Sequence, residues 1–253
     1  MDNEGTDDFI VRCQAIWREA RLELTEQQRF DLAESLVGMV YPRYRFSEFG
    51  RIYLTNSEFH RFYVEYVSAY NFHSYDRKYL LREILKLCGG VPGDTAECGV
   101  YEGAGSYLIA HHAAGFGRLH HLFDSFEGLS EPEGLDGTYW KRGAMCVPEE
   151  RVRERLRDLD NVRLWQGWIP ERFYEVADRQ FSFLHVDVDL YQPTLDSVAF
   201  FYPRMSRGGL MLFDDYGFAT CPGARRAIDE FFAGKGEPII DLPTGQAFVM
   251  IGS

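Results

Sequence analysis

The stretch TAECGVYEGAGS (residues 95–106) decides the fold of this chain. Its first four residues are typical of a short buried strand, its glycines allow a sharp turn, and the pattern over 103–114 is helical. Further helical patterns cover 77–88 and roughly 148–158, 193–205 and 222–233. The apolar runs that follow the first strand are His120–Phe123, Val162–Trp165, Phe181–Val186 and Leu210–Phe213.

This alternation of strand and helix predicts an α/β fold with a doubly wound, mostly parallel sheet. Two closing runs, Pro238–Leu242 and Gln246–Ile251, lie only a few residues apart. We expect them to pair as an antiparallel hairpin, which brings the sheet to seven strands. In open sheets of this kind, ligands bind beyond the carboxyl ends of the strands, and the residues most suited to chemistry fall at these ends.

Residues 1–75 differ from the rest of the chain. A helical pattern covers 8–40, and the following segment to Tyr75 is crowded with aromatic residues, with Arg43, Arg45 and Arg51 among them. These aromatic rings either pack between helices or form a lid that covers a ligand. We predict a helical, aromatic-rich lid over 1–75 and a second domain over 76–253.

The composition of the 253 residues argues against several classes of protein. Asp and Glu outnumber Lys and Arg 39 to 27, and the net charge of -12 disfavours nucleic acid as a partner, because such binding depends on neutralising phosphates. There is no apolar run of about 18 residues to span a membrane, and the acidic N-terminus lacks the features of a secretory signal. The five cysteines are scattered without a CxxC pair, so we expect reduced thiols in a cytoplasmic protein.

The glycine turn after the first strand is more informative in its charge than in its spacing. The spacing GxxxGxG is not the dinucleotide fingerprint GxGxxG. Between Pro92 and Gly117 there is no Lys or Arg, whereas Asp94, Glu97 and Glu102 are acidic. These carboxylates would repel a pyrophosphate and attract a cation. S-adenosylmethionine fits, because its sulfonium and amino groups are positive and it carries no phosphate.

Two further turns predict contacts to such a nucleoside. Asp124 follows the second strand, where a carboxylate can accept hydrogen bonds from both ribose hydroxyls; the alternative is a turn or helix-cap residue. After the third strand, Gly167 and Trp168 reach the same edge of the sheet, where the indole ring of Trp168 either lies beside an adenine or packs in the core.

The motif HVDVDLYQPT (185–194) ends a strand in two aspartates, Asp187 and Asp189, whose spacing places them on the same side of it. The next strand ends in Asp214 and Asp215, so up to four carboxylates meet at one edge of the sheet. Two carboxylates about 4 Å apart repel by roughly 4 kcal/mol at an intermediate dielectric constant, so the cluster needs a proton or a cation. Oxygen ligands favour Mg²⁺ over Zn²⁺, although one or two of the four acids also suit helix caps.

In combination, these motifs resemble those of the macrocin O-methyltransferase family. This family is the metal-dependent branch of class I S-adenosylmethionine methyltransferases and acts on sugar hydroxyls of natural products. The resemblance covers about residues 75–253 and implies a Rossmann-like methyltransferase sheet. It rests on AECGVYEG (96–103), FDSFEGL (123–129), HVDVDLYQPT (185–194), YPR (202–204), GGLMLFDDYG (208–217) and CPGARRAIDEF (221–231).

The resemblance also implies which residues bind. The cofactor contacts implied by the resemblance are Glu97, Gly99, Gly103, Ser106, Asp124 and Ser125. We add Gly167, Trp168 and Asp187 as predicted contacts because they lie at the ends of strands. The implied ligands of Mg²⁺ are Asp187, Asp214 and Asp215. Because members of the family are often homo-oligomers, we also expect a homo-oligomer, with a dimer as the starting hypothesis.

The expected reaction is displacement at the sulfonium methyl group by a hydroxyl oxygen of a small molecule. Mg²⁺ would lower the pKa of that hydroxyl, and adjacent hydroxyls of a sugar or catechol would chelate the ion. Asp187 is the first candidate for the general base and Asp189 the second, whereas we expect His185 to be a packed core histidine. A sugar or glycosylated natural product is the expected acceptor. Polysaccharide or phenolic hydroxyls, a dinucleotide-dependent oxidoreductase and a binding protein without turnover remain as alternatives.

Overall fold

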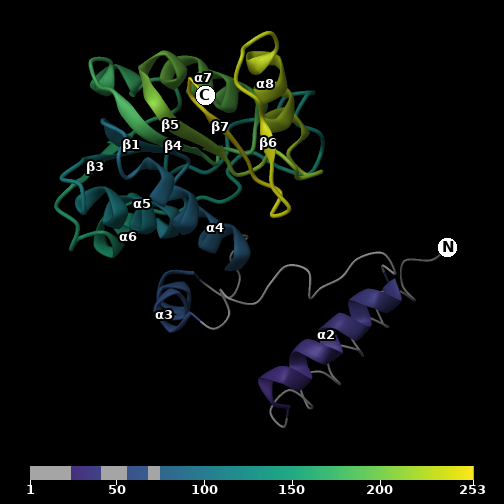
Figure 1. Cartoon of the computed structure of the whole chain (residues 1–253). Helices are drawn as coiled ribbons and strands as arrows, with labels where there is room; N and C mark the ends of the chain where they lie inside the picture. The colour runs from purple at the N-terminus through teal and green to yellow at the C-terminus, as the bar shows by residue number, and fades with distance from the viewer. Residues whose placement is uncertain (1–23, 41–55, 68–74, 253) are drawn as a thin grey trace. The chain divides into compact units, whose positions relative to one another are not determined.

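The computed structural model describes residues 24–40, 56–67 and 75–252 (Figure 1). The chain divides into two compact units, one up to Ser57 and one from Glu58 to Ser253. In the first unit, helix α2 (Glu26–Val40) begins where Thr25 and Gln28 exchange hydrogen bonds, because each side chain satisfies a free backbone N–H of the other residue. The helix predicted over 8–40 is therefore present from Glu26 onward, and its part over 8–23 lies outside the described residues.

The second unit contains a seven-stranded sheet with the strand order β3-β2-β1-β4-β5-β7-β6. Strands β1 to β5 pair in parallel, whereas β7 is antiparallel to both β5 and β6. This confirms the predicted α/β fold, its mostly parallel sheet and the closing antiparallel hairpin. The strands are β1 (Asp94–Cys98), β2 (His120–Asp124), β3 (Val162–Gln166), β4 (Phe181–Val186), β5 (Met205–Phe213), β6 (Ile240–Asp241) and β7 (Ala247–Met250).

Helices cover both faces of this sheet. Helices α4 and α5 lie on one face and α7 and α8 on the other (Figure 1). Along β5, Leu210 and Leu212 pack toward α4 and α5, whereas Met211 and Phe213 belong to the core on the opposite face. Burial on both faces explains why the strands are continuous apolar runs in the sequence. The helices are α3 (Ser57–Tyr66), α4 (Tyr75–Leu85), α5 (Ala104–Ala114), α6 (Glu149–Arg155), α7 (Tyr191–Phe201) and α8 (Pro222–Phe232), with 3₁₀ turns at Lys86–Cys88, Phe173–Val176 and Tyr202–Arg204.

The aromatic residues of α3 pack between helices. The rings of Phe62 and Tyr66 stack on Tyr107 of α5, with centroids 5.6 and 4.0 Å apart, and Phe59 meets Tyr79 of α4 edge-on. For these residues, packing is the correct one of the two interpretations. The aromatic residues and arginines of 41–55 and 68–74 lie outside the described residues, and the division into a lid over 1–75 and a domain over 76–253 stays a prediction.

Strand β5 is longer than its apolar run. It begins at Met205 rather than Leu210, and α7 ends at Phe201 rather than near 205. The early part of β5 holds Arg207 and two glycines, which carry no strand pattern, yet its backbone still pairs with Phe181 of β4 across an irregularity in the register. Pairing with a neighbouring strand, not periodicity, sets this boundary. None of the helices among the described residues is long and apolar enough to cross a membrane.

Candidate active site

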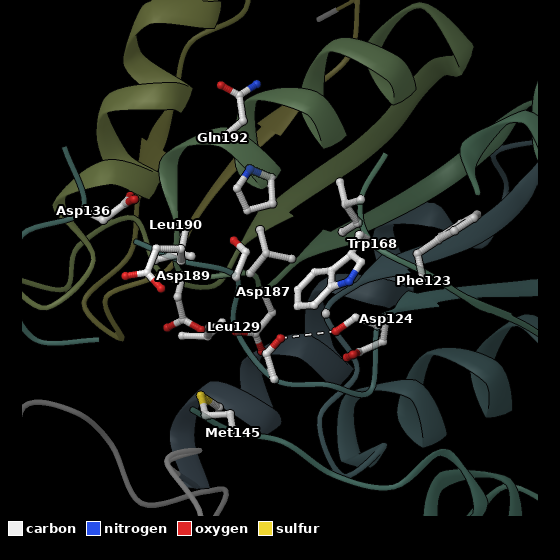
Figure 2. A pocket seen from close by; sticks show the side chains of 18 of the residues that line it. Phe123, Asp124, Leu129, Asp136, Met145, Trp168, Asp187, Asp189, Leu190 and Gln192 are labelled. Carbon is white, nitrogen blue, oxygen red and sulfur yellow. Dashed lines mark hydrogen bonds between the residues drawn. The ribbon is translucent and has the colours of Figure 1, made fainter. Parts of the chain in front are cut away.

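A pocket of about 380 Å³ opens at the carboxyl edge of the sheet, where β1, β2, β3 and β4 end (Figure 2). Among the described residues that line it there is no Lys or Arg. The pocket therefore favours a cationic ligand over a pyrophosphate. Its acidic lining residues are Asp124, Glu131, Glu133, Asp136, Asp187 and Asp189.

The glycine turn that follows β1 forms the floor of the pocket. Gly99 has a φ of +83°, and a Cβ atom at this position would lie 1.8 Å from the carbonyl oxygen of Asp187. Only glycine tolerates both this conformation and this approach. The turn therefore places the predicted cofactor loop directly against the DxD motif, and Gly103, also at positive φ, leads into α5.

Asp124 lines the pocket and also organises its floor. Its carboxylate accepts hydrogen bonds from the backbone N–H groups of Val100, Tyr101 and Phe126, at 2.7, 3.3 and 2.7 Å. Burial raises the pKa of Asp124, and these hydrogen bonds oppose the shift. Asp124 is thus a turn residue that also lines the pocket, and its predicted contact with the ribose hydroxyls stays a prediction. Ser125 also lines the pocket, and its hydroxyl donates to the carbonyl oxygen of Gly128.

Trp168 and Asp124 lie at one end of the pocket, and Asp189 and Asp136 lie at the other, with Asp187 between them (Figure 2). The indole of Trp168 is partly exposed and lines the pocket, whereas Trp165 packs against the core. The backbone N–H of Gly167 donates to the carbonyl oxygen of Asp124 and so joins the end of β3 to that of β2. The end with Trp168 is the one that suits a nucleoside.

Of the predicted cofactor contacts, Gly103 and Gly167 are not among the residues that line the pocket, and neither are the buried residues Glu97 and Ser106. Glu97 is 2% exposed, accepts a hydrogen bond from the Ser106 hydroxyl, and lies 2.9 Å from Nδ1 of His185 and 3.8 Å from Nε2 of His120. Burial alone would raise the pKa of Glu97, but the two histidines lower it to about 2. Direct contact of these four residues with a cofactor stays a prediction.

The structure brings the four aspartates of the DxD and DD motifs to one edge. Asp187 and Asp214 belong to one cluster with His185, and Asp189 and Asp215 belong to another with Cys221; within each cluster the possible ligand atoms all lie within 4.8 Å of one another. The backbone N–H of Asp189 donates to Asp215, which links the two motifs.

The two clusters differ in how their charge is balanced. Asp214 is fully buried, forms an ion pair with Arg77, accepts a hydrogen bond from Gln246 and lies 3.2 Å from His185 Nε2. In the other cluster, burial and then the neighbouring carboxylates raise the pKa of Asp189 to about 7 and that of Asp215 well above its usual value. Without a cation, these raised pKa values favour protonation of the cluster. His185, predicted to be a packed core residue, is fully buried but bridges two carboxylates.

Two cations at the start of α4 were not predicted from the sequence. Besides Arg77, the ammonium group of Lys78 is buried near Asp187, Glu97 and Asp215. Burial lowers the pKa of Lys78, and these carboxylates oppose the shift. A signal was present, because Lys78 precedes Leu81 by three residues and so shares the buried face of the helix. The part of the pocket wall formed by residues 130–136 was also not predicted, since it carries no motif or periodicity.

The donor atoms fit a hard divalent ion. Asp187, Asp214 and Asp215 each offer oxygen, but the structure groups Asp187 and Asp214 with His185, and Asp215 with Asp189 and Cys221. The buried Oδ2 atom of Asp214 forms the ion pair with Arg77. Against the two cations of α4, five carboxylates converge here: Glu97, Asp187, Asp189, Asp214 and Asp215. Mg²⁺ prefers such a set of ligands.

A seven-stranded sheet of this order, with an acidic pocket at its carboxyl edge, defines the class of Rossmann-like methyltransferases. The chain belongs to the macrocin O-methyltransferase family, whose sequence model matches residues 77–244. The O-methyltransferase NovP has a similar structure, with a TM-score of 0.63, 26% identity, and coverage of 74% of this chain and 84% of NovP. A calicheamicin methyltransferase shares the fold, with a TM-score of 0.62 at 20% identity, and covers 70% of this chain and 79% of its own.

Two curated relatives have similar sequences. The demethyldecarbamoylnovobiocin O-methyltransferase of Streptomyces niveus is 32% identical over 160 residues, which are 56% of this chain and 59% of the relative. The 8-demethyl-8-(2,3-dimethoxy-alpha-L-rhamnosyl)-tetracenomycin-C 4'-O-methyltransferase of Streptomyces olivaceus is 32% identical over 173 residues, which are 62% of this chain and 65% of the relative. The chain thus spans about three fifths of the length of these relatives.

Proposed function

We propose that this protein is a Mg²⁺-dependent O-methyltransferase that transfers the methyl group of S-adenosylmethionine to a hydroxyl of a sugar or glycosylated natural product. The observation that carries the proposal is the pocket itself. Its described lining contains six carboxylates and no basic side chain, on the fold of a methyltransferase family. Such a lining stabilises a sulfonium and an ammonium group and opposes a dinucleotide.

The two ends of the pocket bind different ligands. The end with Trp168 and Asp124 receives the nucleoside, where the indole ring offers a stacking surface and the carboxylate accepts hydrogen bonds from the ribose. The end with Asp189 and Asp136 receives the acceptor. Asp187 lies between them, where the methyl group and the hydroxyl must meet.

The residues of the chain position the hydroxyl and take its proton. Asp187, Asp214 and Asp215 would hold Mg²⁺, which supplies Lewis-acid activation of the hydroxyl when bound. Asp187 is the first candidate for the general base, and Asp189 is the second; both line the pocket. Arg77 and Lys78 hold the carboxylates of the site in place from below.

The names of the relatives support a sugar as the acceptor. One of them names a rhamnosyl tetracenomycin methylated at a 4' hydroxyl, and another is a mycinamicin III 3''-O-methyltransferase. Adjacent hydroxyls of a sugar chelate a divalent ion, which suits a site beside Asp187, the one proposed ligand among the described residues that lines the pocket. Polysaccharide and phenolic hydroxyls are the alternative acceptors.

The test is methyl transfer from S-adenosylmethionine, measured as release of S-adenosylhomocysteine. The probes are methyl α-L-rhamnopyranoside, glycosylated macrolides and a catechol. We expect transfer to a glycoside that stops with EDTA and returns with Mg²⁺, and a loss of at least about a hundredfold in Asp214→Asn. The matched control is Asp158→Asn, because the Asp158 side chain is 91% exposed and far from any motif.

Two outcomes would contradict the proposal. Activity that survives both EDTA and Asp214→Asn would rule out the metal role. Thermal stabilisation by NAD alone, with none by S-adenosylhomocysteine, would rule out the methyltransferase. Stabilisation of Asp214→Asn by S-adenosylhomocysteine shows that the variant is folded when its activity is lost.

A further inference from the structure

The acceptor end of the pocket is walled by the long connection between β2 and α6. Its side chains face the end of the pocket that lies away from Trp168 (Figure 2). The connection closes on itself, because the N–H of Leu129 donates to Ala144 and the N–H of Gly143 donates back to Leu129. The residues of this segment, the acceptor wall, that line the pocket are Leu129, Ser130, Glu131, Glu133, Asp136 and Met145.

Asp136 ties the acceptor wall to helix α7. Its side chain is 3% exposed, and its two oxygens accept the backbone N–H groups of Tyr191, at 2.6 Å, and Glu133, at 2.8 Å. Tyr191 is the first residue of α7, and the next two residues of that helix, Gln192 and Pro193, line the pocket. A carboxylate at a helix N-terminus is held strongly, since it meets both a free N–H group and the helix dipole.

The start of helix α8 is shaped around this contact. A Cβ atom at Gly223 would lie 2.0 Å from Oδ1 of Asp136 and 3.0 Å from the backbone nitrogen of Tyr191. Gly223 is not among the residues that line the pocket. Nearby, the indole N–H of Trp140, from the same connection between β2 and α6, donates to the sulfur of Cys221 at the start of α8, at 3.3 Å.

We propose that Asp136 is a positioning residue that sets the acceptor end of the pocket. It acts by holding the acceptor wall against the start of α7, so that Gln192 and the wall present one fixed surface to the methyl acceptor. The inference rests on the proposed function. Because the cofactor end is formed by residues at the ends of β1, β2 and β3 and not by the acceptor wall, Asp136 governs acceptor binding and not binding of S-adenosylmethionine.

Two variants disturb this contact in different ways. In Asp136→Asn, the amide offers one accepting oxygen in place of two, so one of the two backbone N–H groups loses its partner. Gly223→Ala displaces the carboxylate of Asp136 by steric contact without changing any charge, and residue 223 itself does not line the pocket. The control is Asp94→Asn, because Asp94 also accepts a loop N–H group, from Leu119 at 3.1 Å, but at the opposite edge of the sheet.

The first measurement is amide hydrogen exchange in the full chain with S-adenosylhomocysteine bound, which needs no acceptor. We expect exchange in residues 129–136 and at Tyr191 to accelerate about tenfold in both Asp136→Asn and Gly223→Ala, and to stay unchanged in Asp94→Asn. In kinetics with the glycoside probe that the wild type methylates, KM for the acceptor should rise about tenfold, while KM for S-adenosylmethionine changes by less than about twofold.

Each contrary outcome overturns the inference. Unchanged exchange in both variants shows that the contact does not hold the wall. A raised acceptor KM in Asp136→Asn but not in Gly223→Ala shows that the charge of Asp136 acts, not its position. A fall in kcat with an unchanged acceptor KM places Asp136 in the chemistry. If the wild-type protein methylates none of the probes, the proposed function is wrong. The hydrogen-exchange measurement still decides the role of Asp136, because it needs no acceptor.

Discussion

Glu97 illustrates how charge is balanced at the level of single residues. This buried carboxylate is held by His185, His120 and Ser106, and the cations Arg77 and Lys78 of α4 also lie below the pocket. The groups that balance Glu97 are thus not among the residues that line the pocket, and they do not offset the charge of the lining carboxylates directly. Replacing one member of this buried network leaves the others without a partner, which costs more than a surface charge does.

Glu97 should make the stability of the protein depend on acid pH. Its pKa is about 2 in the folded chain and 4.5 ordinarily, so the ionised carboxylate stabilises the fold above about pH 4.5, by roughly 3 kcal/mol, and this contribution disappears as the pH falls toward 2. We expect Glu97→Gln to lower the free energy of unfolding most at neutral pH, with the difference from wild type shrinking below about pH 4.5. Urea unfolding at several pH values measures this.

The control for that experiment is Glu154→Gln. The Glu154 side chain is 69% exposed, and among the described residues it pairs with Arg157 at the surface. We expect this variant to change the free energy of unfolding by less than about 1 kcal/mol at every pH. A constant difference between Glu97→Gln and wild type across the pH range would show that the variant acts through packing and not through the charge of Glu97.

Among the elements, the turn between β1 and α5 joins three strands at one glycine. The N–H of Gly99 donates to Phe123 at the end of β2, and the N–H of Asp187 after β4 donates to Cys98 at the end of β1. This close approach requires that position 99 have no side chain. The floor of the pocket and the DxD motif are therefore one structural unit.

Gly99→Ala and Gly117→Ala separate backbone conformation from crowding. Both glycines have positive φ, but a Cβ atom at Gly117 meets nothing within 4 Å, whereas one at Gly99 lies 1.8 Å from the Asp187 carbonyl oxygen. We expect Gly117→Ala to lower the free energy of unfolding by about 1 to 2 kcal/mol, and we expect this variant to bind S-adenosylhomocysteine normally. Gly99→Ala should lower the free energy of unfolding by clearly more, because the backbone must move to accommodate the side chain. This variant should also bind S-adenosylhomocysteine at least about tenfold more weakly.

Urea unfolding and calorimetric titration with S-adenosylhomocysteine check both variants. Equal losses of stability would show that conformation alone makes glycine necessary at position 99. Normal binding by Gly99→Ala would show that the turn is not part of the cofactor site.

At the scale of the whole molecule, the sheet and the pocket belong to the second unit. Every predicted site residue, from Glu97 to Asp215, lies there, and helix α2 lies in the first unit. The second unit also contains α3, whose rings pack on α5 and complete its core. All residues of the predicted cofactor site therefore belong to the second unit.

Deleting residues 1–40 should separate cofactor binding from methyl transfer. We expect the affinity for S-adenosylhomocysteine to change by less than about twofold, because the residues that line the pocket are kept, and we expect the transfer rate to fall, because a lid excludes water from the reactive donor. Titration and a methyl-transfer assay on the shortened chain measure the two quantities. Unchanged transfer would show that residues 1–40 are not a lid.

Much of the fold was predictable from the sequence, and less of the site. The parallel strands, the closing hairpin and the acids at the strand ends were predicted, because each is marked by a local pattern. Lys78 was missed because its charge conceals its place on a buried helix face. The early part of β5 around Arg207 was missed because only its pairing with β4 makes it a strand.

The sequence by itself determined the order of strands and helices and the places of Asp124, Asp187 and Asp214 at strand ends, since apolar periodicity and glycine turns act over a few neighbouring residues. Only the tertiary structure decided that Glu97 lies beneath the pocket between two histidines and that Asp136 joins a loop to a helix. These contacts link residues far apart in the chain, and they form only when the sheet and its helices pack together.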